Sequence, residues 1–118
     1  MMEEVRVAHV LIKHTGSQNP VSRRTNLAIS LTIEEARSEI DEIRRLIFVD
    51  PLEYAHSFRR QAENKSDCSS FRNGGDLGFF GRGTMQRPFE DAAFGLQVGD
   101  VSSCVSTASG LHLIHRIG

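Results

Sequence analysis

Residues 5–13 form an apolar segment in which both sides of an extended chain would be hydrophobic. Successive side chains of a strand point to opposite faces of the sheet. One face would carry Val5, Val7, His9 and Leu11, and the other would carry Ala8, Val10 and Ile12. Near-continuous apolar runs are typical of strands that are buried on both faces. The pattern therefore predicts a strand in the middle of a sheet that is covered on both sides.

Two amphipathic helices are predicted after a long loop over residues 14–30, which contains glycine, serine, asparagine and proline without a sustained period. Thr32 stands three residues before Glu35, the spacing of a capping box at the start of a helix. The apolar stripe of this helix is Ile33, Ala36, Ile40, Ile43 and Ile47. A second helix begins at Asp50 as N-cap with Pro51 in its first turn. Its apolar stripe is Leu52, Ala55, Phe58 and Ala62.

Short elements set among turns are predicted for the second half of the chain. Their expected ranges are 66–71 for a short helix, 77–80 for a short strand, and 101–106 and 111–117 for two strands joined at Ser109-Gly110. Pro88 opens a further helix, whose inner face would be Phe89, Ala92, Ala93 and Leu96. This order of elements predicts an α+β fold, with a small mixed sheet covered by helices, and the length predicts a single domain over residues 1–118.

Composition and charge narrow the class of protein. The chain has 14 Lys and Arg against 15 Asp and Glu, a formal net charge of −1. Domains that coat nucleic acid or an anionic membrane are usually basic, so we expect neither partner. Cys68 and Cys104 are the two cysteines and are interpreted as free thiols, because nothing directs the chain to an oxidising compartment. We expect a soluble monomer in the cytoplasm, the nucleus or both.

His9 and His112 stand in the first and last predicted strands, which are often neighbours in small α+β domains. Each could be a core histidine bonded to the backbone, but Thr107 and Ser109 just before His112 favour a shared polar cluster. Cys68 lies in a polar loop, where it could be an inert thiol or a nucleophile activated by a histidine. A zinc site made by His9, Cys68 and His112 is disfavoured, because no paired ligand spacing such as C-x-x-C occurs.

Two further groups of residues could form a binding site. Between Val5 and Ile33 the chain has no acidic residue and carries four cations, Arg6, Lys13, Arg23 and Arg24. Such a segment suits a phosphate, although it could equally be a solvated loop. The second group consists of large apolar residues in or beside glycine-rich loops, namely Leu77, Phe79, Met85 and Phe89. These residues are either core or the walls of a small apolar socket beside the polar cluster.

Five motifs in this order resemble the parvulin family of peptidyl-prolyl cis/trans isomerases, most closely its phosphorylation-directed Pin1-type branch. They are residues 5–14 (VRVAHVLIKH), 66–70 (SDCSS), 75–83 (GDLGFFGRG), 85–92 (MQRPFEDA) and 109–112 (SGLH). The resemblance runs from about residue 5 to residue 118. It implies a mostly antiparallel four-stranded sheet surrounded by about four helices, in the order β-α-α-α-β-α-β-β. A WW domain, common ahead of this domain in the branch, is not expected, because the sequence contains no tryptophan.

The resemblance also implies an activity and a site. The activity is cis/trans isomerisation of X–Pro bonds without a cofactor or metal, on proteins phosphorylated at Ser-Pro or Thr-Pro. The implied catalytic cluster is His9, Cys68, Thr107, Ser109 and His112; the implied proline pocket is Leu77, Met85 and Phe89, with Gln86 as a backbone-directed contact. Lys13 matches a phosphate-contacting lysine. The branch usually has two arginines at the positions of Gln18 and Asn19, whereas this chain has its pair at Arg23 and Arg24.

Binding of a twisted amide is the mechanism that we expect from these residues, because rotation about X–Pro needs no bond to be made. The histidines would be neutral and would orient each other, and Cys68 would tune the field near the carbonyl without attacking it. Two other hypotheses stay open at this point. One is a cysteine hydrolase that uses Cys68 with His9 or His112. The other is a phosphopeptide-binding module that has no catalytic activity.

Overall fold

The computed structural model describes residues 3–118, so the first two residues of the expected domain lie outside the described part. Its strands are β1 (Glu4–Ile12), β2 (Asp76–Gly81), β3 (Val105–Thr107) and β4 (Gly110–Arg116). Its helices are α1 (Ile33–Ile47), α2 (Tyr54–Lys65) and α3 (Arg87–Gly95), with short 3-10 helices at Pro51–Glu53 and Ser69–Asn73. No helix within residues 3–118 has both the length and the apolar character needed to cross a membrane.

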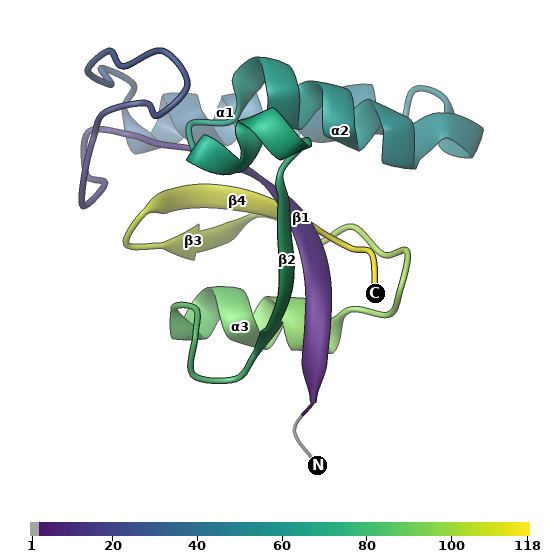
Figure 1. The fold of residues 1–118 in the computed structure, drawn as a ribbon. Coiled ribbons are helices and arrows are strands. Elements are labelled where there is room, and N and C mark those ends of the chain that lie inside the picture. Colours follow the sequence, from purple (N-terminus) through teal and green to yellow (C-terminus); the bar gives the residue numbers. More distant parts are fainter. Residues whose placement is uncertain (1–2) are drawn as a thin grey trace.

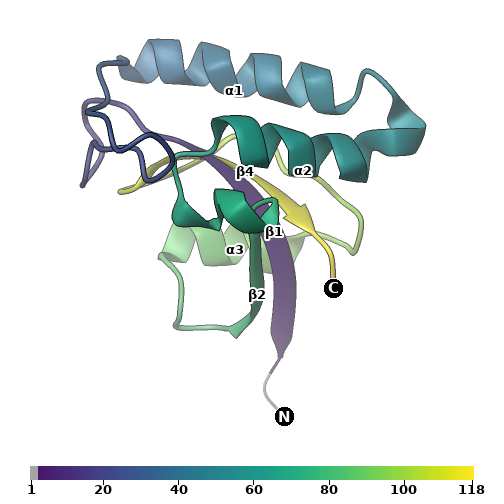
Figure 2. The ribbon, with the colours of Figure 1, turned by 45° about the horizontal axis from the view of Figure 1, so that its top comes forward.

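The strands form one sheet in the order β2-β1-β4-β3, and each neighbouring pair is antiparallel. The mixed sheet expected from the order of elements is therefore wrong, and the antiparallel sheet implied by the resemblance is confirmed. Helices α1 and α2 lie side by side over one face of the sheet, and α3 covers the other (Figures 1 and 2). Strands β1 and β4 occupy the centre, as the apolar pattern of residues 5–13 predicts.

The two faces of β1 belong to different hydrophobic clusters, in agreement with the predicted alternation. Ala8, Val10 and Ile12 pack with α1 and α2. Val5 and Val7 pack with Phe89 of α3 and its neighbours. Because side chains two positions apart share a face, His9 and Leu11 continue the α3 side of the strand beyond Val7. The α3 side of β1 is therefore apolar at Val5 and Val7 and presents a histidine further along the strand.

The first helix begins as predicted. Glu35 N–H donates to Thr32 Oγ1 (3.1 Å), and Thr32 N–H donates to Glu35 Oε1 (2.9 Å), which completes the capping box. The buried stripe is Ala36, Ile40, Ile43 and Ile47. Ile33 is exposed, so only this member of the predicted stripe is wrong.

The second helix differs from its prediction at its start. Asp50 caps it, but the first turn is a 3-10 helix, in which three residues rather than 3.6 complete a turn. Leu52 is consequently 93% exposed, and Ala55 is also exposed, while Tyr54 packs inward in their place. Phe58 and Ala62 are buried as expected.

The short elements of the second half are partly displaced from their expected ranges. The predicted helix at 66–71 is the 3-10 helix Ser69–Asn73, because Ser66 and Asp67 bond to the neighbouring strand and loop instead. The predicted strand at 101–106 is reduced to Val105–Thr107. Beside β4, the N–H of Ile114 donates to the side-chain Oγ of Ser102 (3.0 Å), where a regular sheet would have a backbone carbonyl as the acceptor. That exchange interrupts the ladder before Val105.

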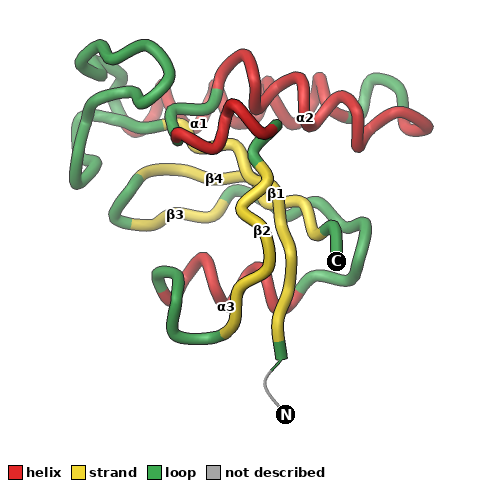
Figure 3. Tube along the Cα trace, in the orientation of Figure 1, coloured by secondary structure: helices red, strands yellow, loops and turns green. Residues whose placement is uncertain are grey.

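Figure 3 shows the long irregular segment between β1 and α1, which folds beside the end of the sheet. It is closed by a single bridge between Val21 and Ala28. Gln18 N–H donates to the carbonyl of Ala108 (2.8 Å), in the turn between β3 and β4. The segment is therefore attached to the same turn that stands beside the predicted catalytic cluster.

Candidate active site

The two strand histidines meet, because β1 and β4 are neighbours in the sheet. Leu11 is opposite His112, so His9 and His112 lie on adjacent strands one diagonal step apart. The Nδ1 atoms of His9 and His112 are 3.0 Å apart, and the two rings stack with centroids at 5.2 Å. Each residue is only 4% exposed. The two imidazoles therefore pair through their Nδ1 atoms inside an apolar core.

The hydrogen-bonded cluster extends from His112 into the turn that follows β3. The Oγ1 atom of Thr107 lies 2.7 Å from His112 Nε2 and accepts from Ser109 N–H (3.1 Å). Burial, aided by the charge of His9, lowers the pKa of His112 to about 3. His112 is therefore neutral at pH 7 and has one ring proton. It follows that one of its two bonds is donated and the other is accepted, so Thr107 and His9 together set its tautomer.

Cys68 adds a polarised sulfur to this cluster. Burial alone raises the pKa of the thiol, but the neighbouring His9 and Ser70 favour the thiolate more strongly and lower the pKa to about 6. The buried Nε2 atom of His9 has no hydrogen-bond partner within residues 3–118. This nitrogen is thus available to the thiol or to a bound molecule, rather than being used by the fold.

Gly75 sets the position of His9 in the strand. His9 N–H donates to the carbonyl of Gly75 (2.9 Å), where the chain passes close to β1 before β2 begins. The φ angle of Gly75 is +84°, and a Cβ atom there would collide with the carbonyl oxygen of His9. Only glycine allows this approach, so the GDLG motif serves the geometry of the cluster.

An apolar cavity of about 190 Å³ opens beside the histidines. Its walls bring together residues from every strand and from α3: His9, Leu11, Cys68, Leu77, Met85, Gln86, Phe89, Thr107, Ser109 and His112. The Phe89 ring meets both histidines edge to face, with centroids 5.5 Å from His9 and 5.1 Å from His112. All nine residues predicted for the catalytic cluster and the proline pocket line this one cavity. Phe79, by contrast, is 60% exposed and lies outside it.

Gln86 closes one side of the apolar cavity. Its Nε2 donates to Ser109 Oγ (2.8 Å), and its Oε1 accepts from Ala108 N–H (3.0 Å). The carbonyl of the same Ala108 accepts from Gln18 N–H. The Ala108 residue therefore joins the rim of the apolar cavity to the long segment between β1 and α1.

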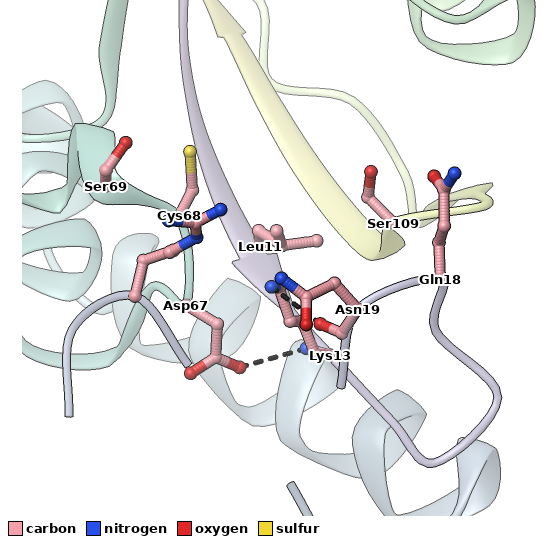
Figure 4. Close-up of a pocket in the computed structure, with 9 residues that line it drawn as sticks. Leu11, Lys13, Gln18, Asn19, Asp67, Cys68, Ser69 and Ser109 are labelled. Atoms are coloured by element: carbon pink, nitrogen blue, oxygen red, sulfur yellow. Dashed lines mark hydrogen bonds between the residues drawn. The ribbon is translucent and has the colours of Figure 1, made fainter. Parts of the chain in front are cut away.

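A second, polar cavity of about 350 Å³ adjoins the first (Figure 4). It is lined by Leu11, Lys13, Gln18, Asn19, Arg23, Asp67, Cys68, Ser69 and Ser109. Leu11, Cys68 and Ser109 line both cavities. Figure 4 shows the Cys68 sulfur and the Ser109 hydroxyl pointing the same way on opposite sides of Leu11. These three residues form a common wall between an apolar and a polar space.

The predicted phosphate-binding residues separate in the structure. Lys13 and Arg23 line the polar cavity, whereas Arg24 lies in a different hollow and donates from Nε to the carbonyl of Ser66 (3.2 Å). Lys13 is 6% exposed, and its Nζ donates to the carbonyls of Asn19 (2.8 Å) and Val21 (2.7 Å). Burial, and then the charge of Arg23, lower the pKa of Lys13, while Asp67 and Cys68 oppose that change.

Sequence reasoning missed the part played by several residues of the polar cavity. Asp67 is the most important of these, because its carboxylate accepts from Lys13 N–H (2.9 Å) and its carbonyl accepts from Arg23 N–H (2.9 Å). Gln18, Asn19 and Ser69 were likewise not predicted to line a site. The available signal was the position of Asp67 directly before Cys68, in a polar segment. Within residues 3–118, no three His, Cys, Asp or Glu side chains are grouped so that they could hold a metal ion.

Comparison with known proteins now connects this geometry to a family. The family model described as "Rotamase: PPIC-type PPIASE domain" matches residues 9–118, which is nearly the whole chain. The chain belongs to this family. The parvulin resemblance found in the sequence motifs is thereby confirmed, together with the α+β fold that it implies.

Several known isomerases are similar to this chain over almost all of its length. The chain is 54% identical over 117 residues to peptidyl-prolyl cis-trans isomerase NIMA-interacting 1 of Theileria annulata, a match that covers 98% of this chain and 81% of that protein. It is 44% identical over 119 residues to Pin1 of Digitalis lanata, covering 98% of each. The solution structure of TbPIN1 superposes with a TM-score of 0.86 at 45% identity and covers 100% of both chains. This parvulin is therefore a Pin1-type peptidyl-prolyl cis/trans isomerase.

Proposed function

We propose that this isomerase prefers X–Pro bonds in which X is a phosphorylated serine or threonine. The observation that carries the proposal is the common wall of Leu11, Cys68 and Ser109 between the two cavities. A proline ring in the apolar cavity leaves the side chain of the preceding residue facing the polar cavity. Lys13 and Arg23 supply positive charge there, and a phosphorylated side chain carries about −1.5 to −2 charges at pH 7.

Catalysis in this proposal is non-covalent. Rotation of the X–Pro bond breaks amide resonance, and the barrier is about 20 kcal/mol. Planar amide resonance places negative charge on the carbonyl oxygen, which water stabilises. Phe89, Met85 and Leu77 hold the ring in a space that excludes water, so the planar forms lose that stabilisation while the twisted form loses less. The neutral His112 and its partner His9 give this space a fixed polar lining.

Cys68 tunes the field at the amide in this mechanism and forms no bond to the substrate. We expect Cys68→Ser to keep isomerase activity within about tenfold of the wild type, because the hydroxyl retains a polar group at the common wall while it loses the ionisation of the thiol. The measurement is kcat/KM by NMR exchange on a phospho-Ser-Pro peptide. A trapped thioester, or complete loss of turnover with a burst before it, would support the cysteine hydrolase hypothesis instead.

Arg23 and Arg24 provide a matched pair for testing the phosphate preference. We expect Arg23→Ala to lower kcat/KM on phospho-Ser-Pro peptides by about 10- to 100-fold, the usual range for losing a charged hydrogen bond. The same change should hardly affect the unphosphorylated peptide. Arg24→Ala removes an equal charge from the neighbouring position outside the polar cavity, and it should have little effect on either peptide. Equal losses on both peptides in Arg23→Ala would contradict the proposed preference.

A further inference from the structure

The loop between β2 and α3, residues 82–86, carries part of the wall of the apolar cavity but has few attachments of its own. Met85 and Gln86 line the cavity from this loop. Gln86 is held by its own side chain, at the end of the loop where α3 begins. Residues 82–84 are exposed, and within residues 3–118 neither Thr84 nor Met85 forms a hydrogen bond. The middle of the loop therefore depends on a contact from outside it.

A buried carboxylate on α3 supplies that contact. Glu90 is 6% exposed, and its Oε1 accepts from Gly83 N–H (2.6 Å). Its Oε2 lies 3.5 Å from Nη1 of Arg82, whose side chain is largely exposed. An exposed ion pair contributes little, whereas a buried carboxylate is costly unless it is hydrogen-bonded. The bond to Gly83 is therefore the one that commits Glu90 to the loop.

Glu90 holds the loop on both sides of Met85. Its side chain fixes Gly83, and its backbone N–H donates to the carbonyl of Gln86 (2.9 Å). The residue itself lines neither cavity. It directly follows Phe89, which is buried in the core and forms the facing wall of the apolar cavity. The separation between the walls at Met85 and Phe89 is thus set by a bond made outside the cavity.

We propose that Glu90 is a positioning residue of this isomerase, which keeps Met85 against the proline ring by tying Gly83 to α3. The inference rests on the proposed function, because it needs the apolar cavity to take the proline ring. A methionine side chain is unbranched and adaptable, so it forms a defined wall only where its backbone is fixed. A displacement of about 1 Å in the groups that position a substrate can lower a rate by about 100-fold.

Two substitutions separate the reach of Glu90 from its charge. Glu90→Gln keeps an oxygen that can accept from Gly83 N–H, so kcat/KM should stay within about twofold of the wild type. Glu90→Asp keeps the charge but is one methylene shorter, so it should lose the bond and lower kcat/KM by about tenfold. The measurement is NMR exchange, expressed per folded molecule. Equal activities in the two variants, or the reverse order, would overturn the inference.

The same loss is expected on an alanine-proline and a phosphoserine-proline peptide, since both place the same ring against Met85. The phosphate preference is read separately, from the ratio of the two peptides in the wild-type chain. Asp91→Ala is the control, because it removes an acid from the next position of α3, where the side chain is exposed and paired with Arg87. An equal loss in this control would assign the effect to charge near the start of the helix and would contradict the inference.

The Met85 methyl group gives a direct readout of the positioning. Its NMR order parameter should fall in Glu90→Asp and stay near the wild-type value in Asp91→Ala. A general loss of stability, which thermal unfolding measures, would not select this one methyl group. An unchanged order parameter in a folded Glu90→Asp protein would show that the loop is held by other contacts, and the inference would fail.

A double-mutant cycle shows whether Glu90 acts through Met85. Met85→Ala alone should lower kcat/KM by about tenfold, and adding Glu90→Asp to it should cost at most about a further twofold. Fully additive losses would overturn the inference. If Met85→Ala lowers activity and Glu90→Asp does not, the inference alone fails. If Met85→Ala has no effect, the role proposed for the apolar cavity fails, and the inference fails with it.

Discussion

Replacing Phe89 with alanine is expected to destabilise the protein by about 3–5 kcal/mol and to lower kcat/KM on every X–Pro peptide, whatever residue precedes proline. The ring is buried in the cluster on the α3 side of the sheet and also meets both histidines edge to face. Its removal leaves a void in the core and deletes a wall of the apolar cavity. Chemical denaturation measures the first effect, and activity per folded molecule at low temperature measures the second.

Phe94 is the matched control on the same helix. It is partly buried against the same cluster and packs on Phe80, but it does not line the apolar cavity. Phe94→Ala should therefore lower stability while it leaves the activity of the folded fraction near the wild-type value. If each variant loses activity only in proportion to the fraction of protein that is unfolded, Phe89 is a core residue and has no part in holding the proline ring.

Acidification is expected to destabilise the protein already at pH values higher than those at which carboxylates become protonated. His112 has a folded-state pKa of about 3 against an ordinary value of 6.5. The unfolded chain therefore binds a proton between these values and the folded chain does not, so stability is complete above pH 6.5 and falls as the pH decreases. At pH 4.5, two pH units below the ordinary value, the loss is about 3 kcal/mol. Burial also lowers the pKa of His115, which adds to the loss in the same direction.

Urea denaturation at pH 7 and pH 4.5 measures this loss. Because the thiolate of Cys68 also disappears over that range, the comparison is cleanest in the Cys68→Ser background. Adding His112→Asn should reduce stability at pH 7 but make the fall towards pH 4.5 smaller. The carboxyl groups of Asp76 and Glu42 have lowered pKa values, and their effect is felt mainly below pH 4.5. An undiminished fall in the His112→Asn protein would assign the acid sensitivity to other groups.

The apolar cavity could be anticipated from the sequence because its residues follow regular periods. The two-residue repeat of strands places His9 on the same side as Val5 and Val7, and the first and last strands are neighbours as expected. Phe89 follows Pro88 in the first turn of α3, where the start of the helix is encoded locally. Here the local pattern and the tertiary arrangement agree.

The polar cavity could be anticipated only in part. Arg23 and Arg24 are adjacent in sequence, yet one lines the cavity and the other bonds to Ser66, because the loop has no period that relates side-chain direction to position. Asp67 reaches Lys13 across 54 positions of sequence, through a contact that no local rule describes. The burial predicted for Leu52 was likewise wrong, because a single 3-10 turn changes which positions of the helix face the core. Charge counted along a segment therefore overstates the charge that a ligand meets.

The turn at Ala108 constrains how this protein can diverge. Its side chain is exposed, so many residue types are sterically acceptable there, whereas its backbone amide and carbonyl are committed to Gln86 and Gln18. Substitutions at position 108 should accumulate easily, but an insertion or deletion would detach both neighbours at once. Among related sequences we therefore expect the length of this hairpin to stay constant while the residue type at position 108 varies.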